Sequence, residues 1–206
     1  MGIEVLIVQH GEKVRSAGDP GLTALGRQQA ATVANWLLAN YPDIESIWAS
    51  PLRRARETAR PAAAAFKLEV RIDARLRERM NWGDDTSIGR DEFLAEWQRA
   101  SDDPSYQPIV GDSAGQAAMR FIAALADIGG HAAQGVALVF AHGGVTVDAL
   151  RSVVGDEAVK AADPRLIVDG VASCAITKVL SDGGRVTVGH YPSTSHLDDT
   201  TGHQPA

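Results

Sequence analysis

Two histidines of this chain share a sequence setting that could support chemistry. His10 comes just after the apolar run 3–8, His142 comes just after the run 135–140, and each histidine is followed by glycine. In open α/β sheets, ligands bind beyond the carboxyl ends of the strands. The two imidazoles could therefore face each other there, with glycine allowing close backbone approach. From this geometry alone, a structural role for either histidine stays open.

The elements that must position these histidines alternate between strand and helix patterns. Short apolar or alternating runs predict strands at 3–8, 44–49, 68–72, 135–140, 171–180 and 185–191. Apolar residues at helical spacing predict helices over 24–37, 51–66, 90–100, 114–128 and 145–154. This alternation predicts an α/β domain with a mostly parallel sheet. The last two strands flank Asp182-Gly183-Gly184 and predict a hairpin that adds an antiparallel edge.

Two helix starts carry capping signals. Thr23 stands at the N-cap position of the first helix, where a hydroxyl can accept from a backbone N–H group. Ser50-Pro51 has the pattern of an N-cap followed by proline at the first helical position. Pro61 lies inside the same helix and predicts a kink, because proline lacks the backbone donor and clashes one turn back.

Regular periodicity weakens between about residues 73 and 109, apart from the helix at 90–100, and we place a lid segment at about 79–109. A long segment of this kind inside a compact domain is often a functional lid. We expect one domain over 1–197 that includes this lid, followed by a flexible tail at 198–206.

Composition restricts the class of protein. The chain has 206 residues, 45% of them hydrophobic, and a net charge of -6, which gives no support to nucleic-acid binding. Cys174 is the sole cysteine, so the chain has no intrachain disulfide and no cysteine metal cluster. It falls in a predicted strand, and we expect an inert buried thiol. The first strand pattern begins at Ile3, and no apolar run is long enough to span a bilayer. We therefore expect a cytoplasmic protein with no membrane partner.

Seven short segments carry a family pattern in a fixed order. They are His10-Gly11-Glu12, the stretch 21–30, the stretch 50–59 (SPLRRARETA), Leu76-Arg77-Glu78-Arg79, Gly111-Asp112-Ser113, the stretch 139–144 (VFAHGG) and Thr194-Ser195-His196-Leu197. This ordered set resembles the histidine phosphatase superfamily, the phosphoglycerate mutase-like proteins, over nearly the whole chain. A lone His-Gly pair would be a weak signal, whereas the ordered set is specific.

The resemblance implies a three-layer α/β/α fold and a phosphatase that needs no metal or cofactor. It implies catalytic roles for His10 as nucleophile and Glu78 as proton donor, and substrate-binding roles for Arg54, His142, Thr23 and Gln9. The residue types suit phosphoryl transfer, in which catalysis is largely positioning and electrostatic stabilisation. A neutral histidine can attack phosphorus, and a guanidinium matches phosphate oxygens. From spacing alone, Arg54 and Glu78 could instead be solvated surface charges.

Gln9 is the one departure in the motifs, because the family has arginine before the first histidine. A hydrogen bond to a charged group is worth about 1.5–3 kcal/mol, so its loss would weaken stabilisation about 10- to 150-fold. The glutamine amide can still donate, and Lys13 or Arg15 on the same loop could compensate. The site is therefore interpreted as altered, with its nucleophile, second cation, acid and second histidine intact.

Three functions follow from this interpretation. The first is a phosphomonoester hydrolase that acts on a small phosphorylated metabolite. Its layout is closer to the small phosphatases of the superfamily than to the mutases, because Glu78 lacks the longer segment that follows in the mutases. The second is a weakened or inactive member that binds an anionic metabolite. The third is a mutase-like phosphotransferase, which needs a second acceptor site. A homodimer is compatible with the sequence.

Overall fold

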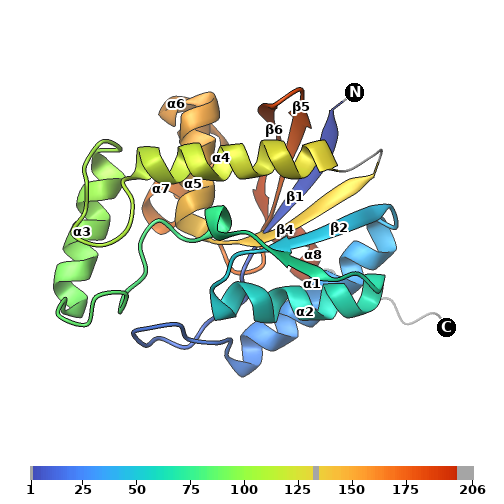
Figure 1. The fold of residues 1–206 in the computed structure, drawn as a ribbon, viewed down its shortest axis with the longest axis horizontal. Coiled ribbons are helices and arrows are strands. Elements are labelled where there is room, and N and C mark those ends of the chain that lie inside the picture. Colours follow the sequence, from blue (N-terminus) through green and yellow to red (C-terminus); the bar gives the residue numbers. More distant parts are fainter. Residues whose placement is uncertain (1, 132–134, 199–206) are drawn as a thin grey trace.

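The computed structural model describes residues 2–131 and 135–198, and within them a six-stranded sheet forms the middle of the molecule (Figure 1). Its strands are β1 (Ile3–Gln9), β2 (Ile44–Ala49), β3 (Val70–Ile72), β4 (Val136–Ala141), β5 (Ile176–Asp182) and β6 (Arg185–Ser193). The order is β3-β2-β4-β1-β5-β6. The pairings among β3, β2, β4 and β1 are parallel, whereas β5 pairs antiparallel with both β1 and β6. The mostly parallel sheet with an antiparallel edge is thereby confirmed.

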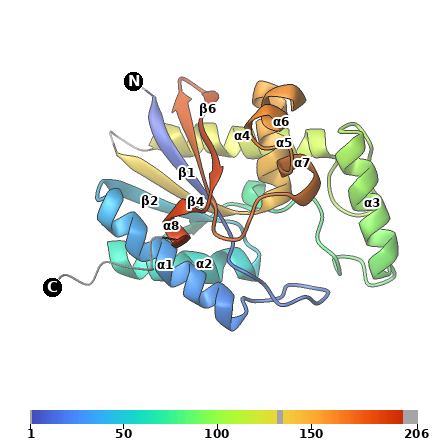
Figure 2. The same cartoon turned by 180° about the vertical axis from the view of Figure 1, so that it is seen from behind.

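Helices cover both faces of the sheet. One face carries α1 (Ala24–Asn40) and α2 (Arg53–Phe66), and the other carries α4 (Ala114–His131) and α5 (Gly143–Val154), as Figures 1 and 2 both show. The remaining helical elements are α3 (Arg90–Asp102), α6 (Asp156–Ala162), α7 (Leu166–Asp169), α8 (Ser195–Asp198) and the 3-10 turn η1 (Ala74–Leu76). Within the described ranges, none of these helices has the length and apolar character required to cross a membrane.

The core follows from the alternation of side chains along β1. Leu6 and Val8 pack into the cluster under α1 and α2, whereas Val5 and Ile7 pack with Phe121 under α4. Both faces of a central parallel strand are therefore apolar, which is why its sequence is a nearly continuous hydrophobic run. The three-layer arrangement is confirmed.

Three parallel strands end at the same level of the sheet. Gln9 pairs with Ala141 at the end of β1 and β4. The backbone N–H of His10 donates to Ala141 O at 3.1 Å, and that of Ser50 donates to Phe140 O at 3.0 Å. The residues that follow β1, β2 and β4 are therefore brought together at one edge. Helix α3 and the loop between β1 and α1 lie at the same end of the molecule (Figures 1 and 2).

Several local predictions are confirmed. The hydroxyl of Thr23 caps α1 by accepting from Gly26 N at 3.0 Å. Gly183 and Gly184 have φ values of 57° and 84°, which are the left-handed conformations of a tight hairpin turn. Strand β3 lies at the sheet edge, as its alternating pattern indicated, although it begins at Val70 instead of Leu68.

Other predictions are wrong at element boundaries. Helix α2 begins at Arg53 after Leu52, so Ser50 is not its cap. Helix α5 begins at Gly143, directly after His142, two residues earlier than expected. Helix α2 continues through Pro61 to Phe66, and a kink there stays a prediction. Of the expected tail at 198–206, Asp198 ends α8, and the rest lies outside the described residues.

The strand expected at 171–180 begins only at Ile176, so Cys174 does not lie in a strand. Cys174 has φ 57°, and its backbone N–H donates to Gln9 O at 3.1 Å and His10 O at 3.3 Å. A turn is favoured here because it satisfies the carbonyl groups where β1 ends. The thiol is buried, and burial raises the pKa of Cys174 to about 12, as expected for an inert thiol.

Two glycines hold the loop after β1 against α1. A Cβ atom on Gly26 would lie 2.0 Å from Glu12 O, and one on Gly11 would lie 2.5 Å from Gly26 O. The Gly11 N–H group also donates to Thr58 Oγ1 at 3.0 Å, which ties the loop to α2. The backbone next to His10 is therefore fixed by close contacts to two helices.

We expect Gly26→Ala to lower the free energy of unfolding by about 1–3 kcal/mol, because the added methyl group would meet backbone atoms that cannot rotate away. Gly130→Ala in α4 is the matched control, since its Cβ would meet nothing within 4 Å. It should be neutral or stabilise by up to about 1 kcal/mol. Urea unfolding of both variants measures the difference, and equal free energies would contradict the close packing at Gly26.

Candidate functional site

The two motif histidines face each other at the ends of β1 and β4. Their ring centroids lie 5.3 Å apart in an edge-to-face arrangement. His10 Nδ1 lies 2.8 Å from Gly11 O, and because a carbonyl oxygen only accepts, Nδ1 carries the hydrogen. Burial, and then the charge of Arg54, lower the pKa of His10 to about 3. The ring is therefore neutral near pH 7, with a lone pair on Nε2.

His142 is fully buried and is held by Ser50. Its Nε2 lies 2.7 Å from Ser50 Oγ, and this hydroxyl also accepts from Leu52 N at 3.3 Å. Burial, and then the charge of Arg54, lower the pKa of His142 well below its usual value. When the Ser50 hydroxyl donates to Nε2, the hydrogen of His142 is on Nδ1. That atom has no partner among the described residues.

Arg54 is a buried cation and not a solvated helix charge. Its exposed fraction is 3%, although it lies in the first turn of α2 beside the exposed Arg53. One terminal nitrogen donates to Asn81 Oδ1 at 3.0 Å, while Nε has no partner in residues 2–131 and 135–198. Burial lowers the pKa of Arg54, and the charge of Glu78 acts in the opposite direction. Arg54 thus carries a buried donor available to an anion.

Glu78 contacts the helix that begins after His142. Its carboxylate accepts from Gly144 N at 3.0 Å and from Val145 N at 2.7 Å. These are N–H groups of the first turn of α5, which have no partner inside the helix. A Cβ on Gly144 would lie 2.7 Å from Glu78 Oε1, so glycine is needed for this approach. Glu78 is therefore placed beside His142 and is not one of several surface charges.

Gln9 and Thr23 are also located in this region. Gln9 is 9% exposed, and its Nε2 lies 3.4 Å from the position of a Cβ on Gly143. Its Oε1 is buried and has no partner within the described part of the chain. The hydroxyl of Thr23 is used inside the loop, where it caps α1 and donates to Glu12 Oε1 at 3.0 Å. A role for Thr23 in substrate binding stays a prediction.

Several positioning residues were not identified from the sequence. Ser50 directly follows β2, as the histidines follow β1 and β4, and that shared setting was a usable signal. Thr58 accepts from Gly11 N and donates to Arg54 O at 2.7 Å, so it links the loop after His10 to the buried cation. Asn81 lies in the segment without periodicity, and no sequence signal indicated its contact with Arg54.

Arg79 connects the Glu78 segment with α3 and α5. Its guanidinium donates to Asp148 Oδ1 at 2.8 Å and to Ser101 Oγ, and lies 4.0 Å from the centroid of the Trp97 ring. Both side chains of the ion pair are buried, at 3% and 1% exposure. The expected lid is therefore anchored on α5 by the residue that follows Glu78.

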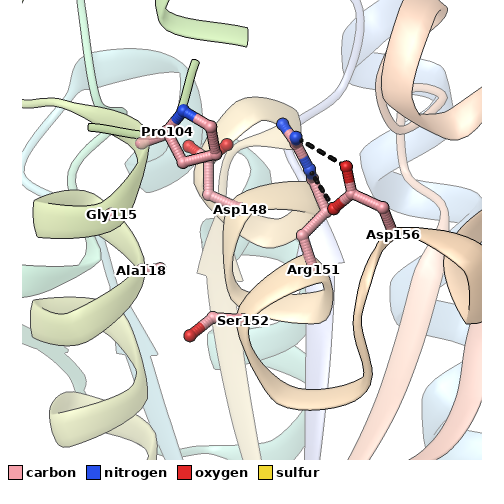
Figure 3. A pocket seen from close by; sticks show the side chains of 8 residues that line it. Pro104, Gly115, Ala118, Asp148, Arg151, Ser152 and Asp156 are labelled. Atoms are coloured by element: carbon pink, nitrogen blue, oxygen red, sulfur yellow. Dashed lines mark hydrogen bonds and ion pairs between the residues drawn. The ribbon is translucent and has the colours of Figure 1, made fainter. Parts of the chain in front are cut away.

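A separate pocket of about 180 Å³ lies between α4 and α5 (Figure 3). Its wall includes Pro104 from the lid, Asp148 and Arg151, and it contains neither motif histidine. Arg151 binds both oxygens of Asp156, at 2.8 and 2.9 Å, and donates to Ser101 O at 2.7 Å. This pocket therefore belongs to the attachment of the lid and not to the histidine site.

The family model of the histidine phosphatase superfamily (branch 1) matches residues 5–193. The chain belongs to the histidine phosphatase superfamily. The match spans nearly the whole sequence and confirms the family resemblance of the ordered motifs.

Similar sequences match over shorter stretches. An uncharacterized protein of Mycobacterium tuberculosis, Rv0525, is 41% identical over 93 residues, which cover 42% of this chain and 45% of the relative. A probable phosphoglycerate mutase GpmB of Enterobacter sp. is 39% identical over 83 residues, which cover 37% of this chain and 38% of the relative. The chain thus spans less than half the length of these curated relatives in the alignments.

Solved structures share the fold at low sequence identity. The mycobacterial glucosyl-3-phosphoglycerate phosphatase Rv2419c has a TM-score of 0.73 at 22% identity, over 94% of this chain and 100% of its own. The phosphoserine phosphatase of Entamoeba histolytica, in complex with 3-phosphoglyceric acid, has a TM-score of 0.68 at 23% identity, over 95% of this chain and 99% of its own. These comparisons confirm the phosphoglycerate mutase-like fold.

We expect Arg79→Met to lower the free energy of unfolding by about 3–5 kcal/mol near pH 8, because it leaves Asp148 buried without its cation. Burial raises the pKa of Asp148 to about 7, and the charge of Arg79 opposes this rise. A raised folded-state pKa means that stability from this carboxyl is lost as pH rises from about 4 through 7. Without Arg79 this loss of stability extends to higher pH. The difference in free energy of unfolding between Arg79→Met and the wild type should therefore be smaller near pH 5 than near pH 8.

Arg165→Met is the control for this measurement, because Arg165 pairs with Asp163 on the surface, at 79% and 37% exposure. Exposed ion pairs contribute little, and we expect a change of at most about 1 kcal/mol at either pH. Urea unfolding at the two pH values compares the variants. A pH-independent deficit for Arg79→Met would contradict the assignment to Asp148.

Proposed function

We propose that this protein is a phosphomonoester hydrolase that acts on a small phosphorylated metabolite through a phosphohistidine at His10. One observation carries the proposal. A neutral His10 ring lies edge to face with His142 and within the influence of the Arg54 charge, and both neighbours carry a buried atom without a partner in the described residues, His142 Nδ1 and Arg54 Nε. Buried polar atoms are normally hydrogen-bonded, so their lack of partners here points to a bound acceptor.

A phosphoryl group fits this combination of side chains. It carries negative charge on several oxygens, which can accept from a guanidinium and an imidazole at the same time. Burial of Arg54 at 3% exposure strengthens such a contact, because the surrounding dielectric is low. The family membership supports the same interpretation, as do the names of the structural relatives, which are phosphatases.

The reaction would proceed in two displacements. His10 Nε2 attacks phosphorus and forms the P–N bond while the ester P–O bond breaks, and Glu78 gives its proton to the leaving oxygen. Glu78 then takes a proton from water, and the water oxygen attacks phosphorus and releases His10. Gly11 O accepts from Nδ1 throughout and orients the ring. Arg54 and His142 would stabilise the charge on the oxygens that stay with phosphorus.

The nucleophile can be tested by rapid-quench labelling with a phosphate ester. We expect an acid-labile phosphohistidine in the wild type, and His10→Ala should abolish both the label and turnover. His131→Ala is the control, because His131 is exposed and its ring contacts only Asp127 O and Trp48 in the described structure. Absence of both label and turnover in the wild type, across a broad panel of esters, would favour a binding protein. Transfer to an added hydroxy acid in preference to water would favour a mutase.

The role of Glu78 can be tested by Glu78→Gln, which keeps one acceptor oxygen for the first turn of α5. Loss of general acid–base catalysis should lower kcat for an alkyl phosphate about 10²- to 10⁴-fold. An ester with a good leaving group, such as p-nitrophenyl phosphate, needs no acid in the first step. With that ester we expect the phosphorylated protein to accumulate, because its hydrolysis still needs the base. Equal losses with both esters and no accumulation would contradict this role.

A further inference from the structure

The phosphate site proposed above lacks one cation, because Gln9 is neutral. Gln9 lies at the end of β1 beside Gly143, with its Oε1 buried and unpaired within the part of the chain that the structure describes. Arg54 is the buried cation of the site, and its guanidinium donates to the neutral side chain of Asn81. A phosphomonoester dianion would be neutralised only in part by one guanidinium, so a second cation in the surrounding loop would strengthen its binding.

Lys13 is the residue of that loop with a suitable location. The loop segment after His10 is held by an antiparallel bridge between Lys13 and Leu22 and by the bond from Val14 N to Gly21 O at 3.0 Å. In an extended segment, successive side chains point to opposite sides. Glu12 and Val14 are exposed, whereas Lys13 is half-buried, so the lysine takes the inner side of the loop.

The charge of Lys13 acts on the site residues. Partial burial lowers the pKa of Lys13, and the charges of Arg54 and then Arg15 lower it further. Lys13 in turn is one of the groups that lower the pKa of His10. The charge of Lys13 therefore opposes that of Arg54 and also acts on His10.

No carboxylate of the described residues forms an ion pair with Lys13. The nearest acid along the chain, Glu12, accepts from the hydroxyl of Thr23. Glu78 is committed to two N–H groups of α5. The charges of Glu78, Asp19 and Asp84 act on Arg54, whereas the charges that act on Lys13 are those of Arg54 and Arg15. Lys13 and Arg54 repel each other, and a bound dianion would attract both.

We propose that Lys13 binds the phosphoryl group of the substrate and supplies the positive charge that Gln9 lacks. This inference rests on the proposed function, since it concerns the same site. The ligand class is a phosphomonoester dianion, held by the Arg54 guanidinium on one side and by the Lys13 ammonium on the loop side. A lysine ammonium is a point charge on a flexible side chain, whereas an arginine guanidinium is planar and can bind two phosphate oxygens at once. Lysine would therefore restore the positive charge without the bidentate geometry.

The test is calorimetric titration of the full chain with inorganic phosphate, for the wild type and three variants. Lys13→Met should weaken phosphate binding about 10- to 150-fold, the range for loss of one hydrogen bond to a charged group. Adding Gln9→Arg to Lys13→Met should restore most of the affinity for phosphate. In the wild-type background, Gln9→Arg should increase the affinity by a smaller factor than it does in the Lys13→Met background. Such non-additivity is expected only when the two side chains serve the same ligand.

Arg15→Met is the matched control, because Arg15 is an exposed cation on the same loop. It should change the Kd for phosphate by less than about threefold, consistent with a screened surface charge. Thermal unfolding with and without phosphate shows that each variant is folded, and Lys13→Met should lose most of the stabilisation by phosphate.

The outcomes separate this inference from the proposed function. Unchanged phosphate affinity in folded Lys13→Met, or a larger loss in Arg15→Met, would overturn the role of Lys13 even if His10 becomes phosphorylated. Weakened binding in Lys13→Met together with rescue by Gln9→Arg would support it even if no phosphohistidine forms. A wild type that binds no phosphate would overturn the role of Lys13, whereas the proposed function is decided by the labelling of His10.

Discussion

The placement of the two histidines depends on the parallel pairing of β1 with β4. This pairing continues one residue beyond the strands, where the N–H of His10 donates to Ala141 O. The bond fixes the level at which both chains leave the sheet, so the next residue of β4's chain, His142, meets His10 edge to face. Ser50 is placed at the same level because its N–H donates to Phe140 O, and its hydroxyl binds the imidazole of His142. A shift of one residue between the two strands would separate these rings and turn Gln9 away from α5.

Burial sets the electrostatics of the site more than any single neighbour does. It is the largest cause of the lowered pKa of both histidines and of Arg54. The neutrality of His10 therefore does not depend on which residue occupies position 9. An arginine there would add a positive charge to the site, whereas glutamine leaves the proposed nucleophile neutral and reduces the repulsion among buried cations. Because burial keeps His10 neutral whatever residue occupies position 9, the site can have glutamine there and retain His10, Arg54 and His142.

The expected lid segment is connected to Glu78, the proposed proton donor, through the adjacent residue Arg79. Glu78 binds the first turn of α5, and Arg79 binds Asp148 one turn further along the same helix and carries Trp97 of α3 on its guanidinium. The position of the proposed proton donor and the attachment of the lid are thus coupled through α5. Substitutions in the 79–109 segment can therefore affect Glu78 without touching the histidines.

The sequence by itself determined the elements whose patterns are local. Apolar runs identified the central strands, Thr23 marked the start of α1, and Gly183-Gly184 marked the hairpin, because each signal depends on neighbouring residues. The ordered motifs also named His10, Arg54, Glu78 and His142 before their places were known. Only the tertiary structure decided that Arg54 is buried while Arg53 is exposed, since spacing along α2 does not specify what covers each side of its first turn.

The tertiary structure also decided which partners the polar groups take. Ser50 has the sequence of a helix cap but binds His142, and the residues around Cys174 have the sequence of a strand but form a turn that satisfies the end of β1. The hydrogen-bond partners of Glu78 and Asp148 could not be predicted from the sequence because these partners lie 66 and 69 residues away. The spacing of apolar residues in the sequence indicates which face of a helix or strand is apolar. The hydrogen bonds of buried polar groups depend on contacts between distant segments, and these exist only after the chain has folded.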